Sequence, residues 1–322
     1  MSKIKYRDII HKAAKITWEN KKLWWFGFFA SLMSVGSSSS GNGENFPGGK
    51  ITEEKVADFI TNHVTFVIGA GMFLFILFIL FLVLRVIGRG ALIKSIEKVI
   101  KKEAVSFKPG MKEGKKYFWR VLGIGFMSAA FIIFAVIILA APIVVLFLNK
   151  AYVFGVLLTL LAIAILIPLL MLACFIRVYG YLYAVLGDLR IWTSIENAYV
   201  LFCKNLGASI IMGMIFVLFS IILGLSIIIL LAPVLAALIA LGAFLFLALK
   251  SIGVAIAIGI GAIIVLAITC FIRSVYETFA QTVWILFFYE IAKPQIEEAV
   301  IEEISEIKTT STSDPVKTSE SL

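Results

Sequence analysis

The chain has 322 residues, of which 61% are hydrophobic and 15% are charged, and its mean hydropathy is +1.04. This composition excludes an ordinary soluble protein and predicts a polytopic α-helical membrane protein, because an open sheet cannot satisfy its backbone hydrogen bonds in lipid. A formal net charge of +9 is also typical of nucleic-acid-binding proteins, so the placement of the charges has to decide.

The first 36 residues are predicted to form an interfacial helix followed by a short span. In residues 4–18, apolar side chains fall near one helical face and basic side chains largely on the other, which is typical of a helix lying in the membrane interface. The apolar run 23–35 is only about 20 Å of helix, so its polar neighbours are expected to extend it to a span over about 16–36. The alternative is a signal-peptide core cleaved near Ser34, which the long charged region before it disfavours.

Five longer runs lack any acidic or basic side chain, and each can cross a hydrocarbon core of about 30 Å. Together with 16–36 they predict an all-α membrane bundle of about six spans. The five further spans are expected at about 64–86, 121–148, 153–176, 207–232 and 252–273. Only Asn149–Tyr152 separates the third span from the fourth, so these two are predicted to form an antiparallel hairpin.

The run 206–249 is about 66 Å of helix, twice the length that one crossing needs. Two crossings within it would place the C-terminal tail outside, against the distribution of charges. Because Ala232-Pro233-Val234 matches Ala141-Pro142-Ile143 of the preceding pair of spans, Pro233 is interpreted as the outer end of the fifth span. Residues 234–250 are then predicted to form an outer hairpin or an interfacial helix.

Basic side chains are unevenly divided between alternate connections. Of the 29 Lys and Arg residues, 25 lie in segments that this topology places inside and 4 in segments that it places outside. By the positive-inside rule this predicts a protein of the plasma membrane with both termini cytoplasmic. Orientation and anionic lipid headgroups therefore explain the charge better than nucleic acid does. Amphipathic helices are expected on the cytoplasmic side at 89–102 and 192–202.

The domain of spans is predicted to cover residues 1–292, and residues 293–322 are predicted to form a cytoplasmic tail. Between Glu297 and Glu306, apolar residues alternate with glutamates, which predicts a short acidic amphipathic helix. From Thr309 onward the chain is polar and rich in Ser and Thr, which is typical of disorder. The acidic tail is the expected contact for a protein partner.

An internal repeat is predicted from the arginines that close the apolar runs. The tetrapeptide Cys174-Phe175-Ile176-Arg177 returns as Cys270-Phe271-Ile272-Arg273. Arg85 closes another apolar run, 92 residues before Arg177. We interpret these arginines as the inner ends of three copies of one helical-hairpin unit. Stop-transfer charges would explain each arginine, but not the repeated cysteine. The three cysteines fit no zinc template, so they are predicted to be packing residues, without a metal or cofactor.

Four short motifs accompany this order of elements: Ile10-x-x-Ala13, Trp18-x-Asn20, Phe118-Trp119-Arg120 and Ala198-Tyr199 through Asn205. The chain thereby resembles the six-helix bacterial membrane proteins grouped with the membrane domain of glycerophosphodiester phosphodiesterases, and related families without assigned function. In that family, catalysis belongs to a separate soluble domain that binds a divalent metal and uses histidines. We expect no such domain after residue 292, and His11 and His63 are predicted on opposite sides of the membrane. The resemblance therefore implies a fold and not an enzyme.

The densest group of polar side chains is expected at the cytoplasmic ends of the spans. If the units pack around a common axis, Arg177 and Arg273 would face one vestibule, with Asp188 and Glu277 as countercharges. Structural ion pairs and a site for a lipid headgroup or substrate both fit such a group. Its candidate members are Arg85, Arg177, Asp188, Arg190, Glu196, Arg273 and Glu277.

The predicted hydrocarbon cores hold no acidic or basic residue, which disfavours ion-coupled transport, and the sequence shows neither a nucleophile–base pair nor a metal cluster. The sequence therefore predicts a noncatalytic membrane component that engages anionic lipid or a protein partner at its cytoplasmic face. The alternative is a permease or lipid-handling protein, which would require a polar cavity between the repeated units.

Overall fold

The computed structural model describes residues 4–32 and 64–312, and every element in this part of the chain is an α-helix. The helices are α1 (Tyr6–Glu19), α2 (Leu23–Ser31), α4 (Val64–Ile100), α5 (Phe107–Lys116), α6 (Phe118–Leu148), α7 (Tyr152–Leu186), α8 (Ile191–Lys204) and α9 (Leu206–Thr312). Five stretches are long and apolar enough to cross a membrane: Val64–Ile100, Phe118–Leu148, Tyr152–Leu186, Leu206–Phe244 and Ala257–Ala292. The chain is accordingly a multi-pass helical membrane protein.

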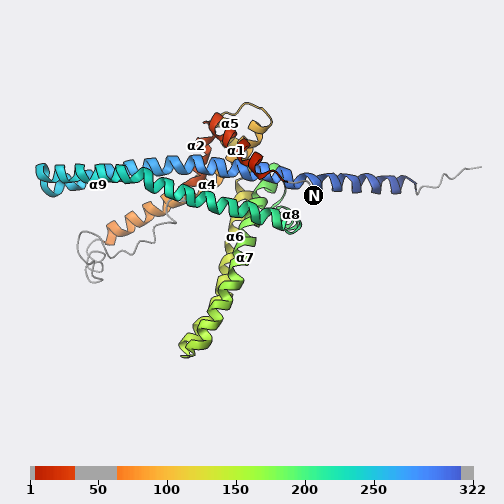
Figure 1. Ribbon diagram of the computed structural model, residues 1–322, viewed down its shortest axis with the longest axis horizontal. Helices are drawn as coiled ribbons and strands as arrows, with labels where there is room; N and C mark the ends of the chain where they lie inside the picture. Colours follow the sequence, from red (N-terminus) through yellow and green to blue (C-terminus); the bar gives the residue numbers. More distant parts are fainter. Residues whose placement is uncertain (1–3, 33–63, 313–322) are drawn as a thin grey trace, which may run out of the picture.

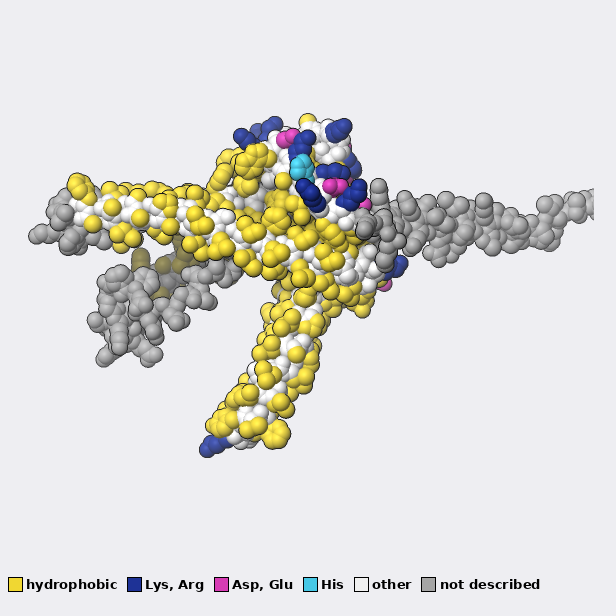
Figure 2. All heavy atoms as spheres, viewed as in Figure 1, with side chains coloured by type: hydrophobic (Ala, Val, Ile, Leu, Met, Phe, Trp, Pro, Cys, Tyr) yellow, Lys and Arg dark blue, Asp and Glu magenta, His cyan; other side chains and the backbone are white. Residues whose placement is uncertain are grey.

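Three apolar arms extend from a common hub (Figure 1). The hub consists of α1, α2, α5 and α8 together with the ends of the long helices that they contact. The arms are the outer part of α4, the hairpin of α6 and α7, and the hairpin that α9 forms. Hydrophobic side chains cover the arms, and most are exposed in the isolated chain (Figure 2). Such surfaces are stable in lipid, where the helices satisfy their own backbone hydrogen bonds.

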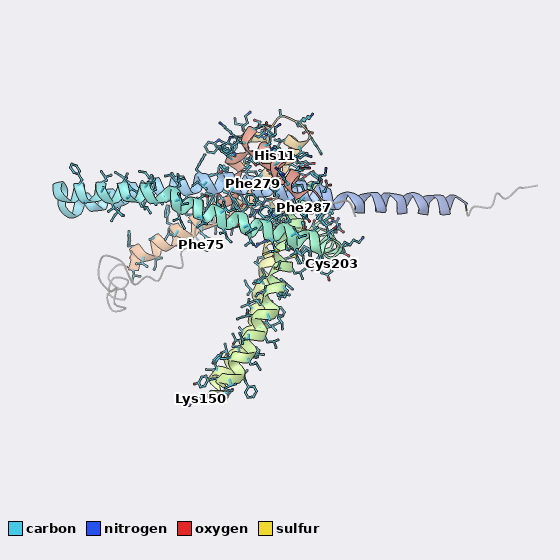
Figure 3. All side chains as sticks on the ribbon, in the orientation of Figure 1. His11, Phe75, Lys150, Cys203, Phe279 and Phe287 are labelled. Carbon is cyan, nitrogen blue, oxygen red and sulfur yellow. The ribbon has the colours of Figure 1, made fainter. Side chains whose placement is uncertain are left out.

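The predicted hairpin between the third and fourth spans is confirmed. The chain reverses at Asn149–Ala151, where Lys150 takes a left-handed conformation with φ 59°. The backbone N–H of Ala151 donates to the carbonyl of Leu146 at 3.0 Å, which closes the end of α6. Lys150 marks the tip of this arm, far from the hub (Figure 3).

The hairpin of α9 differs from the one expected. Its first run, Leu206–Phe244, and its second, Ala257–Ala292, lie side by side, and the hydroxyls of Ser220 and Tyr276 are 2.9 Å apart. The expected end at Pro233 is absent, since this residue lies inside the first run. A proline removes only one backbone donor, and membrane helices tolerate that loss. The chain turns back after Phe244, so 206–244 runs in one direction.

The predicted span over 16–36 is not confirmed. In the described part of this region, α1 ends at Glu19 and α2 is 9 residues long, about 14 Å of helix. Asn20 ends α1 by donating its side-chain amide to the carbonyl of Ile16 at 3.0 Å. The rest of the predicted span, beyond residue 32, and the alternative cleavage near Ser34 lie outside the described residues.

Two predicted boundaries are corrected at the C-terminal ends of α4 and α9. The interfacial helix expected at 89–102 is continuous with its span, because α4 runs unbroken to Ile100. The chain then leaves the helix at Lys102, which has φ 61°, and Pro109 falls in the first turn of α5. Proline is accommodated there because the first N–H groups of a helix have no internal partner. Likewise α9 continues to Thr312, through residues 309–312 that were expected to be disordered.

The core of the protein lies in the hub. Its fully buried large side chains include Tyr179, Phe26, Phe287, Leu182 and Ile285. A short helix precedes each arm in the chain: α1 precedes α2 and α4, α5 precedes α6 and α7, and α8 precedes α9. This order agrees with three repeated units. The repeat and the sixth span both remain predictions.

Candidate functional site

A cavity of about 330 Å³ lies where α4, α6 and α7 meet the hub. Its wall toward the arms is apolar, and three arginines and a tyrosine supply its polar groups. The polar residues are Arg85, Arg89, Arg177 and Tyr181; the others are Leu82, Val86, Val121, Leu122, Gly125, Phe126 and Ala129. Its size falls within the usual range of small-molecule sites.

Arg89 is the most constrained charge of the cavity. Its Nη2 donates to Oε1 of Glu277 at 3.1 Å, and its guanidinium lies 5.3 Å from the centroid of the Tyr181 ring. The two ion-paired side chains are only 18% and 19% exposed, and the amide of Gln281 donates to the same carboxylate oxygen at 3.4 Å. Helix α9 thus supplies the carboxylate that compensates an arginine of α4.

One hydrogen-bond donor of Arg89 has no partner among the described residues. This donor is the Nε, which is buried. Buried donors are nearly always satisfied in folded proteins, so an exception needs an explanation such as a bound group. Arg89 lines the cavity, but its Nε is covered by protein atoms and is not exposed in it.

Arg85 and Arg177 complete the basic lining. Arg85 precedes Arg89 by one turn of α4, and Arg177 precedes Tyr181 by one turn of α7. Both arginines are partly exposed. Since guanidinium groups stay protonated in proteins, the cavity collects three positive charges, with the carboxylate of Glu277 as the countercharge behind them.

The other predicted site residues lie elsewhere in the hub. Asp188, expected opposite Arg177, instead forms ion pairs with Arg120 and with Lys116, whose Nζ lies 3.5 Å from it. The hydrogen bond from Arg120 lowers the pKa of the Asp188 carboxyl below its usual value, and desolvation opposes this effect. The positive φ of 52° at Asp188 marks the turn between α7 and α8.

Arg190, Glu196 and Arg273 are also outside the lining of the cavity. Arg190 and Glu196 are exposed at the start of α8 and along it. Arg273 precedes Glu277 by one turn of α9. Arg85 and Arg177 therefore line one cavity, and Glu277 pairs with Arg89, the third arginine of the lining. Asp188, Arg190 and Glu196 lie elsewhere.

Arg89 and Tyr181 are the site residues that sequence reasoning missed. Arg89 was counted among the charges of an interfacial helix, although its spacing of four from Arg85 places both on one face of α4. Tyr181 follows Arg177 by the same spacing. A search for polar residues one helical turn beyond each predicted arginine would have found both.

No metal centre accompanies the cavity in the part of the chain that the structure describes, where His, Cys, Asp and Glu form no cluster of three. His11 lies in the hub on α1 and is exposed (Figure 3). The three cysteines are free; Cys174 and Cys203 are exposed, which corrects the prediction that they pack in a core.

The basic side chains gather on the hub, whereas the visible faces of the α9 and α6–α7 arms are almost uniformly hydrophobic (Figure 2). These features define a class: a multi-pass helical membrane protein with a basic cavity at the root of its arms. No known protein family, curated protein or solved structure matches the chain. The resemblance to the phosphodiesterase membrane domain therefore stays a prediction, and the function has to be argued from the cavity.

Proposed function

We propose that the protein is a noncatalytic component of the plasma membrane that binds anionic phospholipid at its cytoplasmic face. The observation that carries this proposal is the convergence of Arg85, Arg89 and Arg177 on one cavity. Guanidinium groups match phosphate oxygens in geometry and charge, and they often bind them through two hydrogen bonds at once. The ion pair with Glu277 holds one of the three in place before a ligand arrives.

The surroundings of the cavity suit a lipid. Leu82, Phe126 and Ala129 form an apolar wall toward the arms, along which an acyl chain would run while the headgroup meets the arginines. Arginine is favoured at this depth because its apolar stem lies along the span and its charged end reaches the interface. The excess of Lys and Arg in the connections around the hub supports a cytoplasmic position for both termini.

The experiment is a lipid-binding measurement on the purified full chain. Protein in neutral detergent is mixed with phosphatidylglycerol or phosphatidylcholine, and the bound lipid is quantified after removal of free micelles. We expect preferential retention of phosphatidylglycerol, and we expect R85Q together with R177Q to reduce it by about tenfold or more, since each loses a charge-assisted hydrogen bond.

Arg7→Gln is the control. Arg7 is exposed on α1, so this variant removes one arginine charge from the hub outside the cavity, whereas the double variant removes two inside it. Equal loss of phosphatidylglycerol in R7Q and in the double variant would mean that net charge, and not the cavity, retains the lipid. Equal retention of both lipids by the wild-type protein would refute the proposal.

The same cavity favours a second candidate, a permease or lipid-handling protein. The cavity lies between α4 and the hairpin of α6 and α7, which belong to different predicted units. A protein that moves lipid would accelerate the translocation of a fluorescent phospholipid across vesicles that contain it. A protein that only binds lipid would leave the translocation rate at that of empty vesicles.

A protein partner would contact the acidic tail. Helix α9 extends past Ala292 to Thr312 and so carries the glutamates between 297 and 306 away from the arms. A basic surface on the partner would complement them. A truncation after residue 292 that leaves lipid retention unchanged but abolishes co-purification of a partner would support this assignment.

A further inference from the structure

We propose that the cavity selects a lipid whose headgroup is a terminal phosphate monoester over lipids that carry a phosphodiester. This inference rests on the proposed function, because it names the class of anionic lipid that the same site would take. The chemical difference is one charge and one oxygen. A monoester carries close to two negative charges at neutral pH and three terminal oxygens, whereas a phosphodiester carries one charge and two such oxygens.

The charge of the site favours the dianion. Arg85, Arg89 and Arg177 contribute three positive charges and Glu277 one negative charge, which leaves two to be neutralised. A phosphodiester would leave one positive charge unpaired in a partly buried site, and unpaired buried charges are costly. A phosphate monoester would leave none.

The donors also favour a headgroup with three free oxygens. They come from two sides, Arg85 and Arg89 from α4 and Arg177 from α7. On the third side Gly125 of α6 makes room for the phenol of Tyr181, because a Cβ at this position would lie 2.8 Å from the tyrosine oxygen. A terminal phosphate can accept from several sides at once, whereas a diester is covered on one side by its second substituent.

The apolar wall points to a lipid as the source of the phosphate. A soluble phosphate would use the arginines but would leave Leu82 and Phe126 facing water. An acyl or prenyl chain would cover them and continue along the α6–α7 arm, whose side chains are exposed and hydrophobic. The ligand class is therefore a phosphate monoester with a hydrocarbon anchor.

The test compares lipids and pH on the full-length protein in neutral detergent. Dissociation constants are measured for phosphatidic acid, phosphatidylglycerol and phosphatidylcholine at about pH 8 and about pH 5, on either side of the second ionisation of a phosphate monoester near pH 6. At the higher pH we expect phosphatidic acid to bind about tenfold more tightly than phosphatidylglycerol, the value of one additional charge-assisted hydrogen bond. At the lower pH the two should bind alike.

Phosphatidylglycerol controls for titration of the protein itself. The charged or titratable groups around the site are Arg85 and Arg89 of α4, Arg177 and Tyr181 of α7, and Glu277 of α9 with Arg273 one turn before it, while the lining residues of α6 contribute none. If Glu277 or another protein group caused the pH dependence, phosphatidylglycerol binding would change with pH as well. A flat response for phosphatidylglycerol and a falling one for phosphatidic acid assign the titration to the ligand.

A charge-reduced variant provides a second measurement. Arg177→Gln removes one positive charge from the site, which then matches a monoanion better than a dianion. The preference for phosphatidic acid should therefore fall to about twofold or less. Arg7→Gln should keep the wild-type preference. An unchanged preference in R177Q would overturn the charge-matching argument.

The outcomes separate this inference from the proposed function. If phosphatidic acid and phosphatidylglycerol bind equally at both pH values and both exceed phosphatidylcholine, selection of a monoester is overturned and binding of anionic lipid stands. If neither exceeds phosphatidylcholine, both proposals fall. If inorganic phosphate displaces bound phosphatidic acid when the two are present at equal concentrations, the ligand is free phosphate and the lipid anchor is overturned.

Discussion

The hub and the arms are built by different forces, and their glycines show this directly. In the hub, Gly27 lies against Ser274 and Thr278, and Gly114 lies against Ile87, so closely that a Cβ at either position would overlap backbone oxygen. In the arms, a Cβ at Gly69 would meet no atom of another helix within 4 Å. Protein packing therefore shapes the hub, while the membrane must hold the arms. Changes in the hub should consequently cost stability that matching changes in the arms do not.

The largest effect is expected for the ion pair of the hub. Glu277→Ala removes the carboxylate that compensates Arg89, whose side chain is 18% exposed. Removal of one partner from a mostly buried pair leaves an uncompensated charge, so we expect a loss of about 3 kcal/mol in the free energy of unfolding. Unfolding in mixed micelles of increasing denaturing detergent measures this loss.

Glu196→Ala is the matched control for this prediction. It makes the same substitution at an exposed position of α8 and should unfold at the same detergent concentration as the wild-type protein. The double variant Arg89→Met with Glu277→Leu should recover most of the stability, because replacing both charges removes the penalty together with the pair. Failure of the double variant to recover would show that the hub needs the charges themselves.

An intermediate effect is expected for the glycines. Gly27→Ala forces α2 away from α9 and should cost about 1–3 kcal/mol, as overpacking of a close contact usually does. Gly69→Ala meets open space in the α4 arm and should stay within about 1 kcal/mol of wild type, on the stabilising side, because alanine is the better helix former. Equal behaviour of the two variants in the same unfolding assay would contradict the division into hub and arms.

The arms could be predicted from the sequence, because their signal is local. A run without charges that is longer than the hydrocarbon core defines a span, and the short connection Asn149–Tyr152 leaves only an antiparallel hairpin. The error at Pro233 has the same origin: proline ends helices in water, but within an apolar run the helix continued through it to Phe244.

The hub and its cavity could not be predicted in this way, because their contacts join distant residues. Arg89 and Glu277 are separated by 188 positions, and nothing near Arg89 indicates which carboxylate it meets. Likewise the short run 23–35 resembles a weak span, yet the fit of Gly27 against Ser274 and Thr278 places α2 against α9. The arginines at the ends of the spans were predicted as a group, whereas their shared cavity required the structure.

The smallest effect is expected for the exposed ion pairs of the hub, which sharpen the contrast with Arg89 and Glu277. Asp188 is 53% exposed where it meets Arg120 and Lys116, so removal of its charge should barely change stability at neutral pH. Asp188→Asn tests the charge alone, because asparagine also tolerates the positive φ of 52°. Since the folded-state pKa of Asp188 is lowered, its contribution is present above the usual aspartate pKa and is lost as pH falls through the lowered value. Unfolding midpoints of wild type and D188N should therefore differ slightly at neutral pH and converge once the pH falls below the lowered pKa of Asp188. A neutral-pH loss as large as that of Glu277→Ala would show that the exposed pair is as important to the hub as the buried one.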